Sequence, residues 1–139
     1  MERTEIGALG EFGLIRHLTS DLVTRQPSTL LGVGDDAAVI DAGDKRVLVS
    51  TDMLCEGVHF DLAYTPLKHL GYKSIIVNLS DICAMNAVTT QVTVSLALST
   101  RFSLPAGEEL YAGMRKASEL YRVDLVGGDT PSSWSTLVI

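Results

Sequence analysis

Aspartates recur beside short apolar segments at four places along the chain. In sequence order they are Asp35 and Asp36 in GVGDDAAVI, Asp52 in VLVSTD, Asp81 in NLSD and Asp129 in LVGGDT. A buried carboxylate without a partner is costly, and too few Lys or Arg residues stand nearby to pair with all of these aspartates. A divalent cation would resolve the conflict, because Mg²⁺ prefers oxygen ligands and commonly combines one or two carboxylates with waters and phosphate oxygens. The hydroxyls of Ser50 and Thr51 could supply further oxygen ligands.

The third of these aspartates is expected on a helix. Ser74, Asn78 and Asp81 are spaced i, i+4, i+7, so they form one polar stripe on an otherwise apolar helix. A solvated face would explain the stripe taken alone. The other acidic positions favour a functional site instead.

Glycine pairs stand next to two of the acidic positions. Gly32 and Gly34 precede the first, and Gly127 and Gly128 precede the last. Glycine lets a backbone approach a ligand closely, although ordinary turn glycines would give the same pattern. The segment 32–37 also matches the G-x-G-x-x-G/A dinucleotide pattern, but an apolar β-branched run follows it rather than a helix, and bare carboxylates would repel a pyrophosphate. No GxxxxGK[ST] loop occurs in the sequence. If the protein binds phosphate groups, a metal would therefore have to neutralise their charge, as the lysine of a P-loop does in other proteins.

The elements that would position these residues follow from hydrophobic spacing and turn signals. We expect a helix over 9–22, a hairpin of strands 37–41 and 46–51 around Gly43-Asp44, a helix starting at Thr65-Pro66, a strand over 91–98, a helix from Ser103 to about Tyr121, a strand over 123–126 that ends at Gly127-Gly128-Asp129, and the start of a strand over 135–139. In the second helix Thr65 should be the N-cap and Pro66 the first helical residue. The elements predict one compact domain.

Composition limits the classes of function. With 139 residues and 46% hydrophobic residues, the chain can form a packed core. A net charge of −6 without a basic patch argues against nucleic acid, and no apolar run is long enough for a membrane span. The absence of a signal-peptide pattern, with only Cys55 and Cys83, indicates a cytoplasmic protein. Because the chain ends on what reads as the start of a strand, we expect a fragment of a longer protein.

Five segments, in this order and spacing, carry a resemblance to a known family. They are Glu11-Phe12-x-Leu14-Ile15, GVGDDAAVI, VSTDMLCEGVHF, NLSDICAMNA and LVGGDT. Together they resemble the N-terminal domain of thiamine-monophosphate kinases, in a superfamily with aminoimidazole ribonucleotide synthetase. The resemblance covers nearly all of residues 1–139. It implies an α+β fold, a mixed β-sheet with helices packed on one face, that binds ATP with several Mg²⁺ ions and forms a homodimer through its sheet.

The same resemblance implies roles for individual residues. Those expected to bind Mg²⁺ are Asp36, Ser50, Thr51, Asp52, Asp81 and Asp129. His59, in GVHF, would contact the phosphate of thiamine monophosphate. Those expected to contact ATP are Tyr111, Gly128 and Asp129. Asn86 stands where the family often has glycine, and it tolerates a left-handed helix end nearly as well.

The implied reaction is ATP-dependent phosphorylation of thiamine monophosphate to thiamine diphosphate, by in-line transfer with Mg²⁺ and without an assigned catalytic side chain. Two alternatives stay open: a sister enzyme of the superfamily with another substrate, and a non-catalytic module that binds nucleotide or metal and dimerises. A globular domain with merely solvated acids is a third. The family's C-terminal domain, which supplies further contacts, is absent from this sequence, so the chain alone is expected to be inactive.

Overall fold

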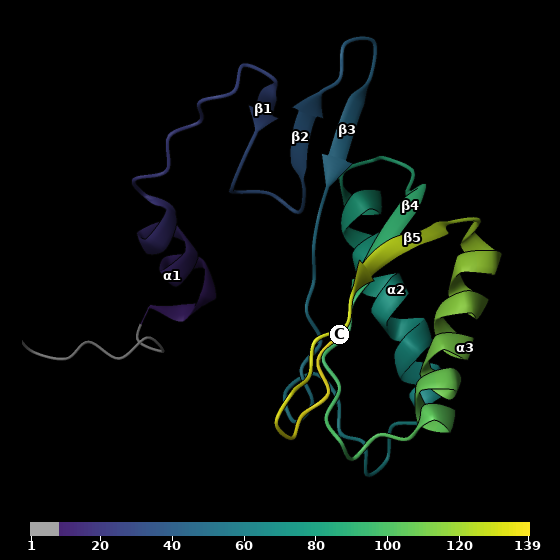
Figure 1. The fold of residues 1–139 in the computed structure, drawn as a ribbon. Coiled ribbons are helices and arrows are strands. Elements are labelled where there is room, and N and C mark those ends of the chain that lie inside the picture. Colours follow the sequence, from purple (N-terminus) through teal and green to yellow (C-terminus); the bar gives the residue numbers. More distant parts are fainter. Residues whose placement is uncertain (1–8) are drawn as a thin grey trace, which may run out of the picture.

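The computed structural model describes residues 9–139, which fold into two groups of elements (Figure 1). The first group contains helix α1 (Gly10–Thr19) and the strands β1 (Thr29–Leu31), β2 (Ala38–Asp41) and β3 (Arg46–Val49). The second contains helix α2 (Leu67–Ala84), strand β4 (Gln91–Ser95), helix α3 (Leu104–Tyr121) and strand β5 (Asp124–Asp129). The α+β class expected from the sequence is confirmed.

Both strand orientations occur, but they are divided between two sheets. Strands β1, β2 and β3 form an antiparallel sheet in that order, whereas β4 and β5 form a parallel pair. The expected hairpin is present, with Ile40 opposite Val47, and Gly43 adopts a φ of 88° in its turn. Strand β1 was not expected, because its three residues are too few to show an alternation of their own.

The main core lies between the parallel strands and the two long helices. Helices α2 and α3 lie on one face of β4 and β5 (Figure 1). Val94 and Leu96 point into this core, as the alternation over 91–98 predicted, and meet Leu70 and Ile75 of α2 and Met114 of α3. Burial of these apolar side chains is the main source of stability for this part of the chain.

The helix ends are partly as predicted. Ser103 is the N-cap of α3 and its hydroxyl accepts a hydrogen bond from the backbone N–H of Ala106. Asn86 adopts a φ of 54° just beyond α2, which confirms the left-handed helix end. The prediction for Thr65 was wrong: Pro66 is the N-cap residue of α2, with no side-chain cap, so the helix begins one residue later than expected.

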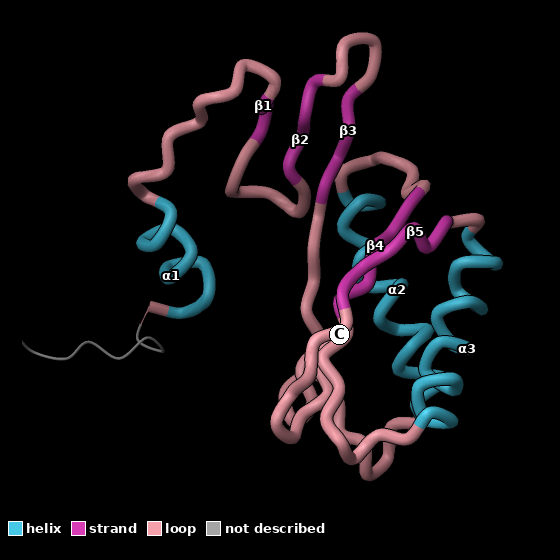
Figure 2. Tube along the Cα trace, in the orientation of Figure 1, coloured by secondary structure: helices cyan, strands magenta, loops and turns pink. Residues whose placement is uncertain are grey.

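Strand β5 and the last residues also differ from expectation. The strand does not end before its glycines but continues through Gly127 and Gly128 to Asp129, and all of it is exposed. The last residues form only part of a strand: Leu54 and Ile139 exchange backbone hydrogen bonds, and so do Ala97 and Val138. Figure 2 shows loops gathered there, at the end of the molecule opposite the antiparallel sheet.

Helix α1 stands apart from the core. It corresponds to the helix expected over 9–22, but none of its residues is buried. Its apolar side chains Phe12 and Leu18 are 80% and 69% exposed. The described part of the chain therefore leaves the apolar face of α1 uncovered.

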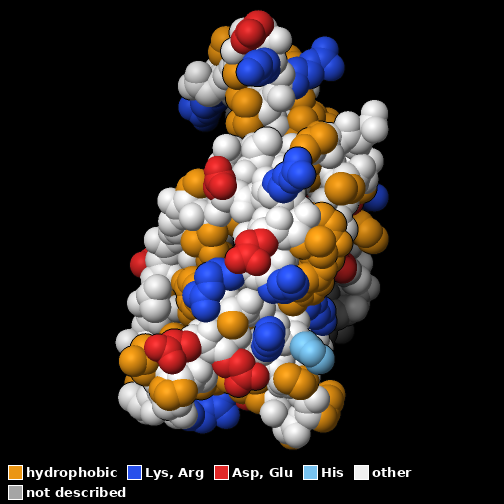
Figure 3. Space-filling view, turned by 90° about the vertical axis from the view of Figure 1, so that its right-hand side faces the viewer, with side chains coloured by type: hydrophobic (Ala, Val, Ile, Leu, Met, Phe, Trp, Pro, Cys, Tyr) orange, Lys and Arg blue, Asp and Glu red, His pale blue; other side chains and the backbone are white. Residues whose placement is uncertain are grey.

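The surface and the helices add two observations. On the face seen from the α3 side, acidic and basic side chains are interspersed among apolar ones (Figure 3). Among residues 9–139, no helix has the length and apolar character needed to cross a membrane.

The backbones of α2 and α3 touch at a pair of buried glycines. A Cβ atom added at Gly71 would overlap the carbonyl oxygen of Leu110, and one added at Gly113 would overlap the carbonyl oxygen of Lys68. Backbone atoms cannot rotate away as a side chain can. Each glycine is therefore required by the close approach of the other helix.

We predict that Gly71→Ala and Gly113→Ala each destabilise the fold by about 1–3 kcal/mol, the usual cost of overpacking, despite the better helix propensity of alanine. Thermal or urea unfolding measures the effect.

Gly107→Ala is the matched control, because Gly107 also lies in α3 but has open space around it. This variant should be stabilised by about 0.5–1 kcal/mol. Equal effects at all three positions would contradict the role of close helix packing.

Candidate active site

The polar stripe of α2 faces the segment that follows β3. The backbone N–H of Asp52 donates to Oδ1 of Asn78 at 3.0 Å, and the hydroxyl of Ser50 lies 2.9 Å from Oδ2 of Asp81. Ser74, the third member of the stripe, is buried and its carbonyl accepts from Nδ2 of Asn78. The stripe is thus not a solvated face: it binds residues 50–52 alongside the helix.

Ser50 joins three segments of the chain. Its Oγ lies 2.8 Å from the carbonyl oxygen of Asp36 as well as 2.9 Å from the carboxylate of Asp81. A hydroxyl carries a single proton, so it donates to one of these acceptors at a time. Ser50 therefore brings the GDD loop before β2, the end of β3 and helix α2 to one point.

The environment of Asp52 disfavours its charged form. The pKa of Asp52 is raised, first by desolvation and then by the charge of Asp81, while the charge of His59 acts in the opposite direction. Burial of the carboxylates, however, is less than the sequence suggested. Asp36, Asp52 and Asp129 are exposed and Asp81 is half-buried, so the argument for a cation rests on the desolvation of Asp52 and on its repulsion by Asp81 rather than on deep burial of all the carboxylates.

The donor set suits Mg²⁺ without forming a complete cage. Within residues 9–139, no three His, Cys, Asp or Glu side chains are close enough together to hold a metal. Mg²⁺ normally takes only one or two carboxylates and completes its octahedron with water and phosphate oxygens. The pair of Asp52 and Asp81, with the nearby oxygen of Ser50, fits such a site.

His59 lies beside this cluster, at a surface pocket of about 280 Å³. Its Nδ1 accepts the backbone N–H of Cys55 at 2.9 Å, so Nε2 carries the proton of the neutral ring. Lys73 of α2 also lines the pocket, and its Nζ donates to the carbonyl oxygen of His59 at 2.9 Å. An imidazole and an ammonium group at one pocket can both bind an anion.

Lys73 was missed by the sequence analysis. It directly precedes Ser74, and no motif marks it. Its position one residue before the polar stripe gave no signal, because adjacent residues of a helix point about 100° apart.

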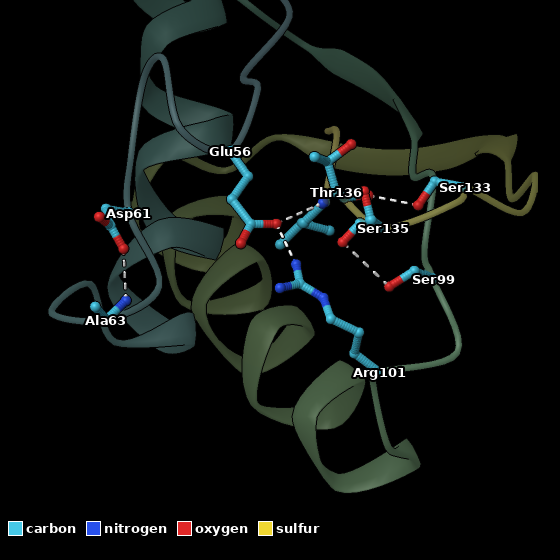
Figure 4. Close-up of polar contacts among 9 residues, drawn as sticks. Glu56, Asp61, Ala63, Ser99, Arg101, Ser133, Ser135 and Thr136 are labelled. Carbon is cyan, nitrogen blue, oxygen red and sulfur yellow. Dashed lines mark hydrogen bonds and ion pairs between the residues drawn. The ribbon is translucent and has the colours of Figure 1, made fainter.

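A second polar contact holds the segment that carries His59. The carboxylate of Glu56 forms an ion pair with Arg101 and accepts the backbone N–H of Leu137 at 2.8 Å (Figure 4). Glu56 lies three residues before His59 in the loop after β3. Glu56 therefore connects this loop to two neighbouring segments: the one after β4, through Arg101, and the last residues of the chain, through Leu137.

The remaining expected site residues lie on other elements. Asp129 ends β5, and its Oδ1 accepts from the N–H of Thr130. Within residues 9–139 no hydrogen bond links Asp129 to Asp36, Asp52 or Asp81. A Cβ at Gly128 would overlap the backbone of β4, so this glycine has a packing role whatever its part in binding.

Tyr111 lies in the first half of α3, half-buried against the core. Thr51, the remaining expected metal ligand, is exposed between Ser50 and Asp52. The structure thus brings together the expected residues of the GDD, STD and NLSD segments and places His59 beside them.

Comparison with known proteins gives a consistent result. The family model described as "AIR synthase related protein, N-terminal domain" matches residues 34–138. Thiamine-monophosphate kinase from Bacillus subtilis is 37% identical over 132 residues, which is 94% of this chain and 40% of the relative. The corresponding Mycobacterium tuberculosis protein is 39% identical over 94% of this chain and 39% of its own length.

Solved structures agree with the fold. A structure described as "AaThiL complexed with AMPPCP and TMP" superimposes with a TM-score of 0.86 at 32% identity, over 99% of this chain and 42% of that one. Thiamine-monophosphate kinase from Stenotrophomonas maltophilia gives a TM-score of 0.61 at 34% identity, over 89% of this chain and 38% of the other. The chain spans about two fifths of the length of these relatives.

The family match covers the GDD loop, the STD segment, the polar stripe of α2 and β5, which are the elements that carry the candidate site. The chain belongs to the family of AIR synthase related proteins and contains their N-terminal domain.

Proposed function

We propose that the protein carrying this chain phosphorylates thiamine monophosphate to thiamine diphosphate with ATP. The observation that carries the proposal is that Ser50 contacts both the carbonyl of Asp36 and the carboxylate of Asp81, while Asn78 holds Asp52 against the same helix, in a chain whose similar structure is described as a complex with AMPPCP and TMP. In this reaction a phosphate oxygen of the acceptor forms a bond to the γ-phosphorus of ATP, the bond from that phosphorus to the bridging oxygen breaks, and ADP leaves.

The proposal includes Mg²⁺ as cofactor, held by Asp36, Ser50, Thr51, Asp52, Asp81 and Asp129. When bound, the ions would neutralise the phosphate charges and stabilise the charge that develops during transfer. The protein's own contribution is to hold the oxygen ligands in place. A phosphate monoester is already largely ionised near neutral pH, because its second pKa is about 6, so no strong general base is required.

His59 and Lys73 are the proposed binding groups for the acceptor phosphate. Both line the pocket beside the acidic cluster, and each could donate a hydrogen bond to a phosphate oxygen. For ATP, Tyr111, Gly128 and Asp129 remain the proposed contacts.

We further propose that residues 1–139 are the ATP- and Mg²⁺-binding, dimer-forming domain of a longer cytoplasmic enzyme. The coverage of two fifths of the relatives supports the division into domains. One face of the β2–β3 hairpin supports a dimer through the sheet. Ile40, Val47 and Val49 share that face and are 36%, 45% and 51% exposed, so a second copy would cover them.

The first experiment is an assay of ADP release by the full-length protein with ATP and Mg²⁺, with and without thiamine monophosphate. Release that depends on thiamine monophosphate is expected. Release without it, or with a different phosphorylated acceptor only, would assign the site to another branch of the superfamily. Binding of nucleotide without release would favour a non-catalytic module.

We predict that Asp36→Asn and Asp81→Asn each lower the rate of ADP release by at least about a hundredfold, as expected when one group that stabilises charge is lost. Asparagine keeps the size of the side chain but removes the charge that a cation requires. Asp44→Asn, in the turn after β2 and outside the cluster, is the control and should keep the normal rate. Near-normal rates in both site variants would remove the support for the site.

Asp52→Asn should separate stability from activity. Because the pKa of Asp52 is raised in the folded state, its charged form is less favourable there than in the unfolded chain. That penalty is absent below the ordinary pKa of 3.8 and appears as the pH rises through the folded-state value. At about pH 7 the variant should therefore be slightly more stable than the wild type, by on the order of a few tenths of a kcal/mol for this exposed side chain, while activity is lost.

Thermal unfolding at about pH 7 and about pH 3 measures the difference, which should vanish at the lower pH because Asp52 is then protonated in both states. A variant that is less stable than the wild type at neutral pH would contradict the penalty that desolvation and the charge of Asp81 impose on ionised Asp52 in the folded state.

A further inference from the structure

Asn78 holds the backbone of Asp52 with its side-chain amide. Its Oδ1 accepts the N–H of Asp52 at 3.0 Å and its Nδ2 donates to the carbonyl oxygen of Ser74 at 3.0 Å. The orientation of the amide is fixed by chemistry, since a backbone N–H only donates and a backbone carbonyl only accepts. With both ends bonded, the half-buried side chain is held in one arrangement.

The location of this contact is significant because Asp52 has no regular structure around it. Residues 50–54 lie in neither helix nor strand, and Asp52 itself is exposed. Helix α2 anchors this segment twice: Asp81 contacts the side chain of Ser50, and Asn78 binds the backbone of Asp52. Asn78 and Asp81 are three residues apart on the helix, and their partners Asp52 and Ser50 are two residues apart in the segment after β3. The two anchors therefore align the segment along the helix.

An anchor is needed here because two like charges lie close together. Asp52 and Asp81 repel each other, and Asp52 is carried by the more exposed of the two segments. This repulsion favours a larger separation of the two carboxylates. The amide of Asn78 is uncharged, so it can hold Asp52 near Asp81 without neutralising the two carboxylates. Their negative charge stays available to bind a cation.

We propose that Asn78 is a positioning residue that sets the separation of the Asp52 and Asp81 carboxylates and thereby the affinity of the site for a divalent cation bound together with a nucleotide. The proposal rests on the function proposed above. It assigns to Asn78 no contact with substrate or metal.

The test is a titration of Mg²⁺ into the full-length protein at saturating AMPPCP, followed by the rise in melting temperature. Asn78→Ala removes the acceptor for the Asp52 N–H. Loss of one hydrogen bond of this kind should raise the Mg²⁺ concentration for half-maximal stabilisation by about tenfold.

Ser80→Ala is the matched control. Ser80 lies on the same helix, is exposed, and its hydroxyl donates only to the carbonyl oxygen of Val77 within the helix. Its Mg²⁺ titration should coincide with that of the wild type. If Asn78→Ala lowers the melting temperature of the free protein but leaves the Mg²⁺ midpoint where it is in Ser80→Ala, Asn78 has only a structural role and the proposal is wrong.

A measurement on the wild type keeps the proposal testable if Asn78→Ala does not fold. Hydrogen exchange followed by NMR should show that the amide of Asp52 is protected relative to the amides of Thr51 and Met53, which have no partner within residues 9–139. Equal exchange at the three amides would show that the anchor does not form in solution, and would overturn the proposal.

These outcomes also separate the inference from the proposed reaction. If Mg²⁺ with AMPPCP stabilises the wild type and Asn78→Ala weakens the effect, the role of Asn78 stands even where thiamine monophosphate does not promote ADP release. If the wild type is stabilised and Asn78→Ala behaves normally, the inference fails and the proposed reaction is unaffected. If Mg²⁺ with AMPPCP leaves the wild type unchanged, both fail.

Discussion

The contact between the backbones of α2 and α3 fixes the position of α2 and, with it, of the residues that α2 contributes to the candidate site. At Gly71 and Gly113 each helix approaches the other so closely that a single methyl group would collide with a carbonyl oxygen. The apolar face of α2 is thereby held in the core beneath β4 and β5. Asn78 lies seven residues, or about two turns, after Gly71, and Asp81 follows three residues later, so both lie near the side of α2 that carries Gly71 and Ser74. The candidate site is therefore built on a helix that is fixed by the core, while the aspartate that this helix binds, Asp52, lies on a segment without regular structure.

The sequence predicted the structure best where that structure depends only on residues that are close together in the chain. The hairpin, the capping of α3 by Ser103 and the alternation over 91–98 depend on neighbouring residues only, and the structure confirms them. The polar stripe could also be predicted, because helical periodicity places Ser74, Asn78 and Asp81 in line. The segment that the stripe contacts could not be predicted, because nothing in residues 50–52 indicates which helix they will lie against. Such pairing depends on the tertiary fold.

The failures have the same origin. The division of the strands into two sheets, the continuation of β5 through its glycines and the start of α2 at Leu67 all depend on contacts between distant segments. Burial of the carboxylates was overestimated because apolar neighbours in sequence need not be neighbours in space, as the exposed Asp36 shows. Lys73 was missed for a similar reason, since it enters the site through the pocket formed with the distant His59 loop.

Helix α1 illustrates how far a domain can depend on what surrounds it. Ten residues are fewer than an isolated helix needs to persist in water, and most helical stability in proteins comes from packing of an apolar face. Because none of its residues is buried, α1 gains no such stabilisation from the rest of residues 9–139. An isolated helix of this length is marginal in water, so the helicity of α1 depends strongly on whatever covers Phe12 and Leu18.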